Sequence, residues 1–130
     1  MSNAPLLSMF ATGTIEPSRF VTLSAAADYT AAQSGTGEKP IGVSQEWSRL
    51  TPLPGAATRA ATTGEEFGAY GVGQVCYLEC GTAIVRADYL KPDTNGKAIK
   101  AAGTDYFGAQ ALASGAVNTV IRVLVQGGKL

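Results

Sequence analysis

Residues 106–126 read YFGAQALASGAVNTVIRVLVQ, and this stretch decides the fold class of the chain. In its second part the side chains alternate between two faces, as they do along a β-strand. The odd-numbered positions are the β-branched residues Thr119, Ile121, Val123 and Val125. The even-numbered positions form a mixed face of Val120, Arg122, Leu124 and Gln126. Residues 107–113 also alternate, and the intervening SGAVN predicts a hairpin with a three- to five-residue loop.

Strand patterns of similar length recur through the rest of the chain. Residues 41–47 alternate after Pro40, and Asn95-Gly96 is a strong signal for a tight hairpin between residues 88–91 and 97–102. Eight or so short strands, with turns about every 8–12 residues, predict an all-β fold. We expect either a compact β-sandwich or a small β-barrel of short antiparallel strands. Residues 18–130 are predicted to form this single β domain, and no sequence repeat at a fixed period is apparent.

The N-terminal residues 1–17 precede the first clear strand pattern. They carry four large apolar side chains, Leu6, Leu7, Met9 and Phe10. One interpretation is a frayed terminus or a short edge strand. The other is an extended N-terminal arm that docks on a neighbouring subunit, because a free tail has little reason to carry four such side chains. In the second case, deletion of residues 1–16 is expected to leave a folded domain that attaches more weakly.

The charge balance argues against partners that require a strong electric field. Ten basic and ten acidic residues cancel, and charged residues make up only 15% of the chain. Nucleic acids and anionic membranes need clustered Lys and Arg, so we expect neither as a partner. No apolar run is long enough to span a membrane, and the start lacks the basic residues of a secretory signal. Low charge with abundant Gly and Ala instead suits a protein covered by copies of itself or by a partner.

Residues able to carry catalysis are scarce. The chain has no histidine, which removes the commonest general base and the commonest transition-metal ligand. Cys76 and Cys80 lie four residues apart in a strand pattern, too far for a disulfide. We expect both thiols to be reduced and buried on one face with Leu78. The sequence therefore predicts no catalytic residues, no metal site and no cofactor, and a protein that is not an enzyme.

A candidate interface surrounds the only tryptophan of the chain. Trp47 ends a strand pattern beside Arg49, Leu50 and a long proline-containing stretch. Trp and Arg are enriched at binding hot spots, and a long segment without clear structure in a compact domain is usually functional. A core anchor is the competing interpretation of Trp47. The predicted interface residues are therefore Trp47, Arg49 and Leu50, together with Leu6, Leu7, Met9 and Phe10.

Four segments, taken in order, resemble one family of small tailed-phage proteins. They are PSRFVTL (17–23), KPIGVSQEW (39–47), GQVCYLECGTAIVRADYLKPDTNGKA (73–98) and GAQALASGAVNTVIRVLV (108–125). The family is that of phage head decoration proteins, also called capsid cement or stabilising proteins. Each segment alone is ordinary β sequence, so the resemblance lies in their order and spacing. It covers most of the chain from about Pro17 onward and has no catalytic residues to transfer.

The resemblance implies a structural virion protein on the outer surface of the phage head, made in the host cytoplasm. Such a protein binds the major capsid protein and stabilises contacts between capsomers against the pressure of packed DNA. It also implies self-association, with a homotrimer favoured by analogy and a dimer left open. The alternative function is a receptor- or carbohydrate-binding β module on the phage particle. That alternative would use exposed aromatic residues such as Trp47, Tyr70, Tyr77 or Tyr106.

Overall fold

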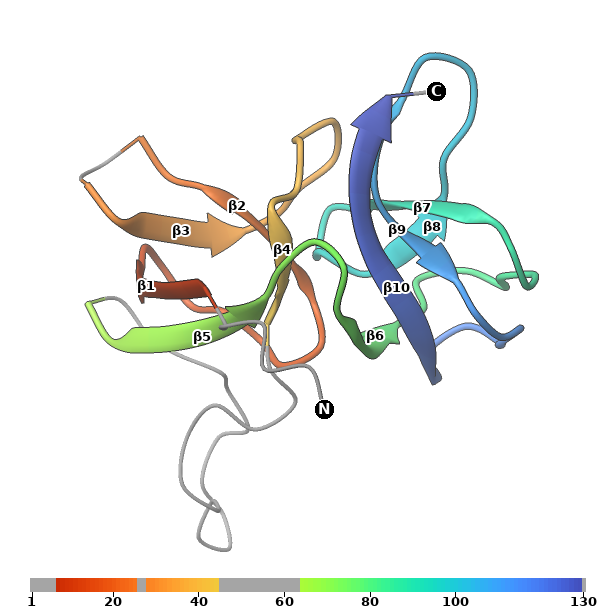
Figure 1. Cartoon of the computed structure of the whole chain (residues 1–130), viewed down its shortest axis with the longest axis horizontal. Helices are drawn as coiled ribbons and strands as arrows, with labels where there is room; N and C mark the ends of the chain where they lie inside the picture. Colours follow the sequence, from red (N-terminus) through yellow and green to blue (C-terminus); the bar gives the residue numbers. More distant parts are fainter. Residues whose placement is uncertain (1–6, 26–27, 45–63, 130) are drawn as a thin grey trace, which may run out of the picture.

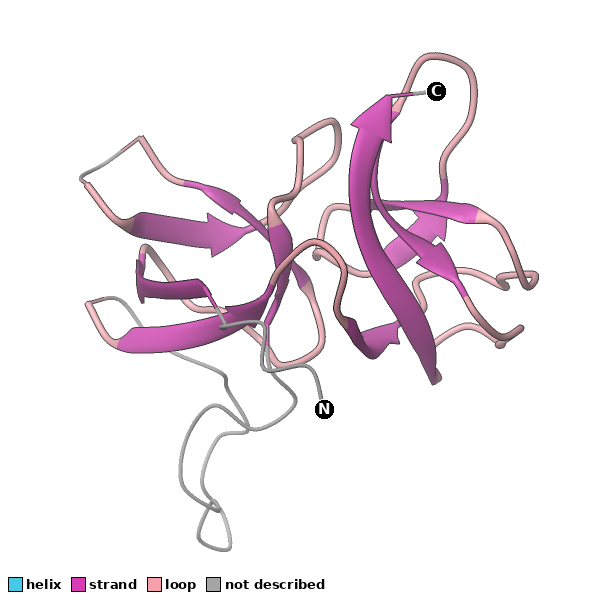
Figure 2. Ribbon diagram, in the orientation of Figure 1, coloured by secondary structure: helices cyan, strands magenta, loops and turns pink. Residues whose placement is uncertain are grey.

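The computed structural model describes residues 7–25, 28–44 and 64–129. This part of the chain is built from β-strands without a helix (Figure 2), so the predicted all-β class is confirmed. The strands are β1 (Leu7–Ala11), β2 (Phe20–Leu23), β3 (Thr30–Gln33), β4 (Gly42–Ser44), β5 (Glu66–Tyr70), β6 (Val75–Glu79), β7 (Tyr89–Pro92), β8 (Ala98–Lys100), β9 (Tyr106–Ala111) and β10 (Val120–Lys129).

The strands form two halves that lie side by side (Figure 1). The N-terminal half, β1 to β5, is a closed barrel with the order β1-β3-β2-β4-β5. The C-terminal half, β6 to β10, is a five-stranded sheet with the order β6-β10-β9-β7-β8. A parallel bridge between Cys80 and Ala98 brings its two outer strands together. Because closure pairs the outer strands, neither half leaves a long row of unpaired backbone groups at a sheet edge.

The two halves repeat one topology and one register. Strands β1 to β5 correspond in order to β6 to β10, and equivalent strands pair with equivalent partners. In the hairpin of the first half Val21 lies opposite Gln33, and in the second half Leu90 lies opposite Lys100. Both hairpins continue from these pairs without a register shift. The shared register indicates that one β unit is present twice in this chain.

The contact that closes each half is also the same. In the N-terminal half the Thr12 N–H donates to the Ala31 carbonyl at 2.8 Å. In the C-terminal half the Gly81 N–H donates to the Ala98 carbonyl at 2.7 Å. Both bonds join a residue one or two positions after the first strand to the third strand of its half. The C-terminal sheet is therefore closed in the same manner as the N-terminal barrel, with a shorter parallel contact.

Each half contains two sharp turns of the chain, which we call elbows: one before its second strand and one before its last strand. Ser18 (φ 56°) and Ala87 (φ 78°) stand just before β2 and β7 in the left-handed region, which costs a non-glycine residue about 1–2 kcal/mol. Gly64 (φ 85°) and Asn118 (φ 65°) stand before β5 and β10. The Gly64 N–H donates to the Ala11 carbonyl, and the Asn118 N–H donates to the Cys80 carbonyl, both at 2.8 Å. These two bonds tie the elbow before the last strand of each half to the end of its first strand. Ser18 and Ala87 are held by other tertiary hydrogen bonds: the Ser18 carbonyl accepts from the Glu79 N–H at 3.0 Å, and the Ala87 N–H donates to the Ala111 carbonyl at 2.9 Å.

Each half has a small core at equivalent positions. The N-terminal half buries small and β-branched side chains because its short strands enclose little volume. Its core residues are Ala11, Ile15, Val21, Ala31 and Ala69. The equivalent residues of the C-terminal half, all buried, are Cys80, Ile84, Leu90, Ala98 and Val123. Cys76, Leu78 and Cys80 share this interior, as the strand pattern predicted.

The halves are joined by a row of side chains on the outside of the N-terminal barrel. Phe20, Val43 and Tyr70 pack with the core of the C-terminal half. The Phe20 N–H also donates at 2.8 Å to the Gly96 carbonyl in the hairpin between β7 and β8. Gly108 must be glycine, because a Cβ atom there would lie 2.8 Å from the Phe20 ring and closer still to Pro40. Apolar burial and close backbone approach together fix the two halves.

The duplication was not visible as a sequence repeat. Few core positions keep the same residue, such as the isoleucines at 15 and 84. The connection between β4 and β5 (45–65) is much longer than the one between β9 and β10 (112–119), so no fixed period exists. The predicted hairpins were nonetheless right. Strands β9 and β10 pair antiparallel, although their link is longer than expected, and Asn95-Gly96 joins β7 to β8.

The predicted boundary of the N-terminal arm differs from the structure. Leu7–Ala11 is strand β1, which pairs antiparallel with β5 and parallel with β3. Ile15 is fully buried in the core of the N-terminal half. Residues 7–17 are therefore part of the barrel, since β1 is hydrogen-bonded on both sides and its removal would open the barrel. Residues 1–6 lie outside the described residues.

The central strand β10 provides a test of the fold. Val123 is fully buried, whereas Val120 in the same strand faces outward. We expect Val123→Asp to prevent folding, because an unpaired buried carboxylate costs about 4 kcal/mol or more. Val120→Asp should leave a cooperative thermal transition, measured by circular dichroism. A cooperatively melting Val123→Asp protein would contradict the inward orientation of this residue.

Candidate functional site

The outer face of the C-terminal half carries a group of exposed apolar side chains. They stand on the sheet side opposite to Ile121, Val123 and Val125, which point into the core. With their exposed fractions they are Val75 (48%), Tyr77 (44%), Tyr89 (37%), Leu112 (44%) and Val120 (49%). Leu124, half-buried, lies among them. We call these six residues the outer face. A contiguous group of this kind on a small protein indicates an interaction surface.

Strand pairing places the outer face in ordered rows. Leu124 lies opposite Val75 on one side and Gln110 on the other, and Gln110 lies opposite Tyr89. In the next row Arg122 lies opposite Tyr77, with its guanidinium carbon 6.0 Å from the ring centroid. This distance permits a cation–π contact that holds the ring over the sheet. The outer face is thus apolar with one fixed cation.

A polar cluster lies where the two halves meet. Arg19 of the N-terminal half and Lys97 of the C-terminal half contact different oxygens of Glu79, at 3.3 and 3.2 Å. Lys97 Nζ also lies 3.0 Å from Asn118 Oδ1, and Arg19 Nη1 donates to the Asn95 carbonyl at 2.9 Å. Both oxygens of the carboxylate are engaged by cations. The cluster therefore serves as a joint between the halves.

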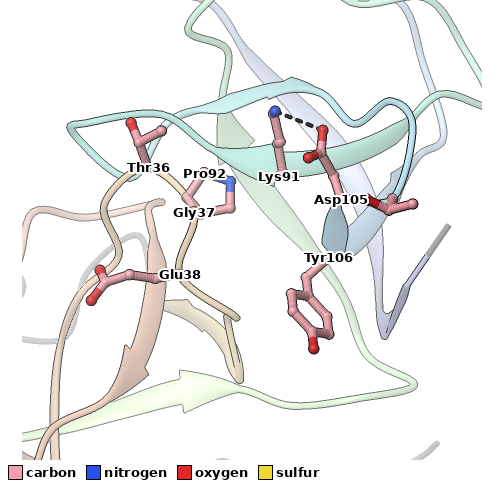
Figure 3. Close-up of a pocket in the computed structure, with 8 residues that line it drawn as sticks. Thr36, Gly37, Glu38, Lys91, Pro92, Asp105 and Tyr106 are labelled. Atoms are coloured by element: carbon pink, nitrogen blue, oxygen red, sulfur yellow. Dashed lines mark hydrogen bonds and ion pairs between the residues drawn. The ribbon is translucent and has the colours of Figure 1, made fainter.

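A crevice of about 220 Å³ opens between the two halves (Figure 3). On one wall Lys91 Nζ lies 2.7 Å from Asp105 Oδ2, which also accepts the Ala102 N–H at 3.0 Å. Glu38, from the N-terminal half, lines the other wall, and Tyr106 of β9 lines the crevice from the C-terminal half. The hydrogen bond from Lys91, followed by that from the Ala102 amide, holds the pKa of Asp105 below its usual value. The charged groups on this wall are thus already paired.

The described residues offer no activated nucleophile. Cys76 and Cys80 are buried, and no disulfide joins them. Burial raises the pKa of the Cys80 thiol, and the opposing hydrogen bond with the Thr119 side chain is the smaller effect. A thiol with a raised pKa stays protonated at neutral pH and reacts slowly. The buried structural interpretation of these cysteines agrees with the structure.

The part of the chain that the structure describes contains neither a metal-binding cluster nor a membrane-spanning helix. Within residues 7–25, 28–44 and 64–129, no three Cys, Asp or Glu side chains gather in a way that could hold a metal ion. None of the described segments is a helix of the length and hydropathy that crossing a membrane requires. A second crevice, of about 410 Å³, is lined by the apolar residues Pro40, Ile41, Val72 and Val125, by three glycines, and by Lys39 and Gln126. Neither crevice presents an acid–base pair suited to catalysis.

Of the interface residues predicted from the sequence, three lie in strand β1 and four lie outside the described residues. Met9 is half-buried against the core of the N-terminal half, and Phe10 is 46% exposed. Leu7 belongs to β1. The remaining four, Leu6, Trp47, Arg49 and Leu50, lie outside the described residues. That these seven residues form an interface therefore remains a prediction.

Sequence reasoning missed the outer face. The alternation in residues 119–126 did separate Val120 and Leu124 from the core side, but that side was interpreted only as mixed. Its neighbours Val75 and Tyr77 come from β6, whose register with β10 could not be read from the sequence. The signal that could have identified the face was the large apolar residue at four outward positions of β6 and β10, Val75, Tyr77, Val120 and Leu124, interrupted by Glu79, Arg122 and Gln126.

Comparisons with known proteins find similarity in fold but not in sequence. No protein-family model matches the chain, and no curated protein matches it in sequence. Among solved structures, the crystal structure of the N base of head fiber gp8.5 from bacteriophage phi29 is similar, with a TM-score of 0.59 and 14% sequence identity. The match covers 95% of this chain and 94% of that chain. The two chains share one fold. It extends over both halves and is not limited to a single barrel.

The Lys91–Asp105 pair gives a pH-dependent prediction. Because the folded pKa of Asp105 is lowered, the pair stabilises the protein above the unfolded pKa, and this contribution is lost as the pH falls through the folded pKa. We expect Lys91→Met to raise the pKa of Asp105 toward its ordinary value, measured by NMR titration of its carboxyl carbon. The control Lys100→Met, at a more exposed lysine 3.8 Å from Asp88, should leave it unchanged. Equal Asp105 titration in all three proteins would contradict the pairing.

Proposed function

We propose that this chain is a structural protein of a tailed-phage head, which binds the outside of the head and stabilises contacts between capsomers. The observation that carries the proposal is the fold match, over 95% of the chain, to the base of a phage head fiber. The ordered sequence segments that resemble head decoration proteins point independently to the same particle. Fold and sequence resemblance thus support one location, the outer surface of the virion.

The physical properties of the chain suit this role. A cement protein holds subunits together through many weak contacts repeated around a symmetry axis, and it needs no chemistry. The outer face supplies exposed apolar contact area, and a net charge of zero avoids repulsion between crowded copies. The proposed partners are the major capsid protein and other copies of this chain, with a trimer favoured over a dimer. A non-enzymatic role is consistent with the absence of histidine from the sequence.

The proposal predicts a loss of head stability when the protein is removed. Phage heads lacking it should release their DNA at a lower temperature than complete heads, measured by dye access during heating. Adding the purified protein back should restore the release temperature, and cryo-electron microscopy should show it as ordered density outside the major shell.

Two outcomes would contradict the role. The protein could be present only in infected-cell lysate and never on virions. Alternatively, it could sit on virions whose heads release DNA at the same temperature without it, which would favour an accessory function over cementing.

Binding of a host glycan is the alternative function, and one observation favours it. Tyr106, 42% exposed, lines the 220 Å³ crevice near two carboxylates, a combination of aromatic and acidic groups found in sugar sites. The Lys39 ammonium lies 5.6 Å from its ring centroid, so one ring face is already approached by a cation. Glycan-array binding abolished by Tyr106→Ala or Trp47→Ala, with head stability unchanged, would favour this function over cementing.

A further inference from the structure

The outward side of strands β2, β4 and β5 in the N-terminal half forms a contact with the C-terminal half. In the N-terminal half, Phe20 lies opposite Val43, and Val43 lies opposite Tyr70, so the three form one row across β2, β4 and β5. Phe20 and Val43 are fully buried, and Tyr70 packs beside them. They point away from their own barrel core and are covered by the C-terminal half. This row is an interface between two copies of the β unit within one chain.

The equivalent row of the C-terminal half is not covered by the described residues of the other half of the chain, and only its Tyr89 ring packs beside a further ring, that of Phe107, at 4.5 Å between centroids. It runs from Tyr89 through Gln110 to Leu124, in the same register on β7, β9 and β10. Tyr89 is 37% exposed, and the other two are only half-buried. The row extends onto β6, where Val75 lies opposite Leu124 and is also exposed. The side of the β unit that is buried in the first half is therefore exposed in the second.

We infer that the outer face of the C-terminal half is covered by a second copy of this chain. The reason is that the same side of the β unit is already covered, in the first half, by a surface of this same chain. Tyr89 replaces Phe20 at the equivalent position, so an aromatic ring is kept where the inner interface needs one. The surface also supplies the self-association that the proposed function invokes, and in that respect it rests on the proposed function.

The polar groups of the face fit such a contact. Gln110 replaces the buried Val43, and its amide is held in place because it donates to the Ala87 carbonyl at 3.2 Å and accepts from Gln126 at 3.1 Å. Arg122 is held against Tyr77. Fixed polar groups within an apolar patch lose little conformational freedom on association. Net charge zero means that two copies approach without overall repulsion.

The test is the self-association of the full chain, measured by sedimentation equilibrium over a dilution series. The wild-type protein should form a dimer or larger assembly. Leu112→Lys and Val120→Lys, at exposed positions of the outer face, should each raise the dissociation constant by about tenfold or more. The matched control is Leu23→Lys, on β2 of the N-terminal half, where the leucine is 61% exposed. It should associate like the wild type, and all three variants should keep the wild-type melting temperature at low concentration.

A wild-type chain that stays monomeric at every concentration would overturn the inference, as would outer-face variants that associate like the wild type. Binding to protein-free phage heads, measured in parallel, separates the two proposals. If the wild type is monomeric but the outer-face variants lose head binding, the face is covered by the shell, and the inference fails while the proposed function stands. If the variants dissociate as expected but no protein binds heads, the inference stands and the proposed function fails.

Discussion

The packing of one aromatic row against a neighbouring barrel is the contact on which this structure depends. Phe20, Val43 and Tyr70 belong to strands of the N-terminal half but pack with the larger core of the C-terminal half. Each barrel alone buries few large side chains, and units of this size are marginal without additional burial. The shared core makes one stable body from two small ones. Gly108 permits the close approach, because any side chain there would collide with the Phe20 ring.

The duplication also explains why the two halves differ in their surfaces. The N-terminal half uses the outside of β2, β4 and β5 to bind the C-terminal half, so that row is apolar and buried. The C-terminal half keeps the same strands and register but replaces Val43 by Gln110 and Phe20 by Tyr89. Tyr89 and Gln110 carry polar groups that water can reach, whereas Phe20 and Val43 are fully buried and carry none. The same row of one β unit is therefore buried in one half and partly exposed in the other.

The sequence predicted the parts of this fold that depend on local pattern. Alternation in residues 119–126 identified β10 and its buried face, and Asn95-Gly96 identified the hairpin of β7 and β8. The elbows could not be predicted, because Ser18 and Ala87 have no intrinsic preference for the left-handed conformation and are held there by tertiary hydrogen bonds. The place of β1 in the barrel was missed because an apolar terminal segment reads equally as a strand or an arm. The outer face required strand register, which alternation within single strands does not provide.

The unequal connections of the two halves have a practical consequence. Residues 45–65 join β4 to β5, and the shorter segment 112–119 joins β9 to β10, yet the ladders on either side keep one register. This elbow of the β unit therefore tolerates added chain length, since lengthening a closed loop costs little entropy. The exposed Val117 of the shorter connection, outside the hydrogen bonds that hold Asn118 and Thr119, is accordingly a suitable position at which to graft a foreign peptide for display.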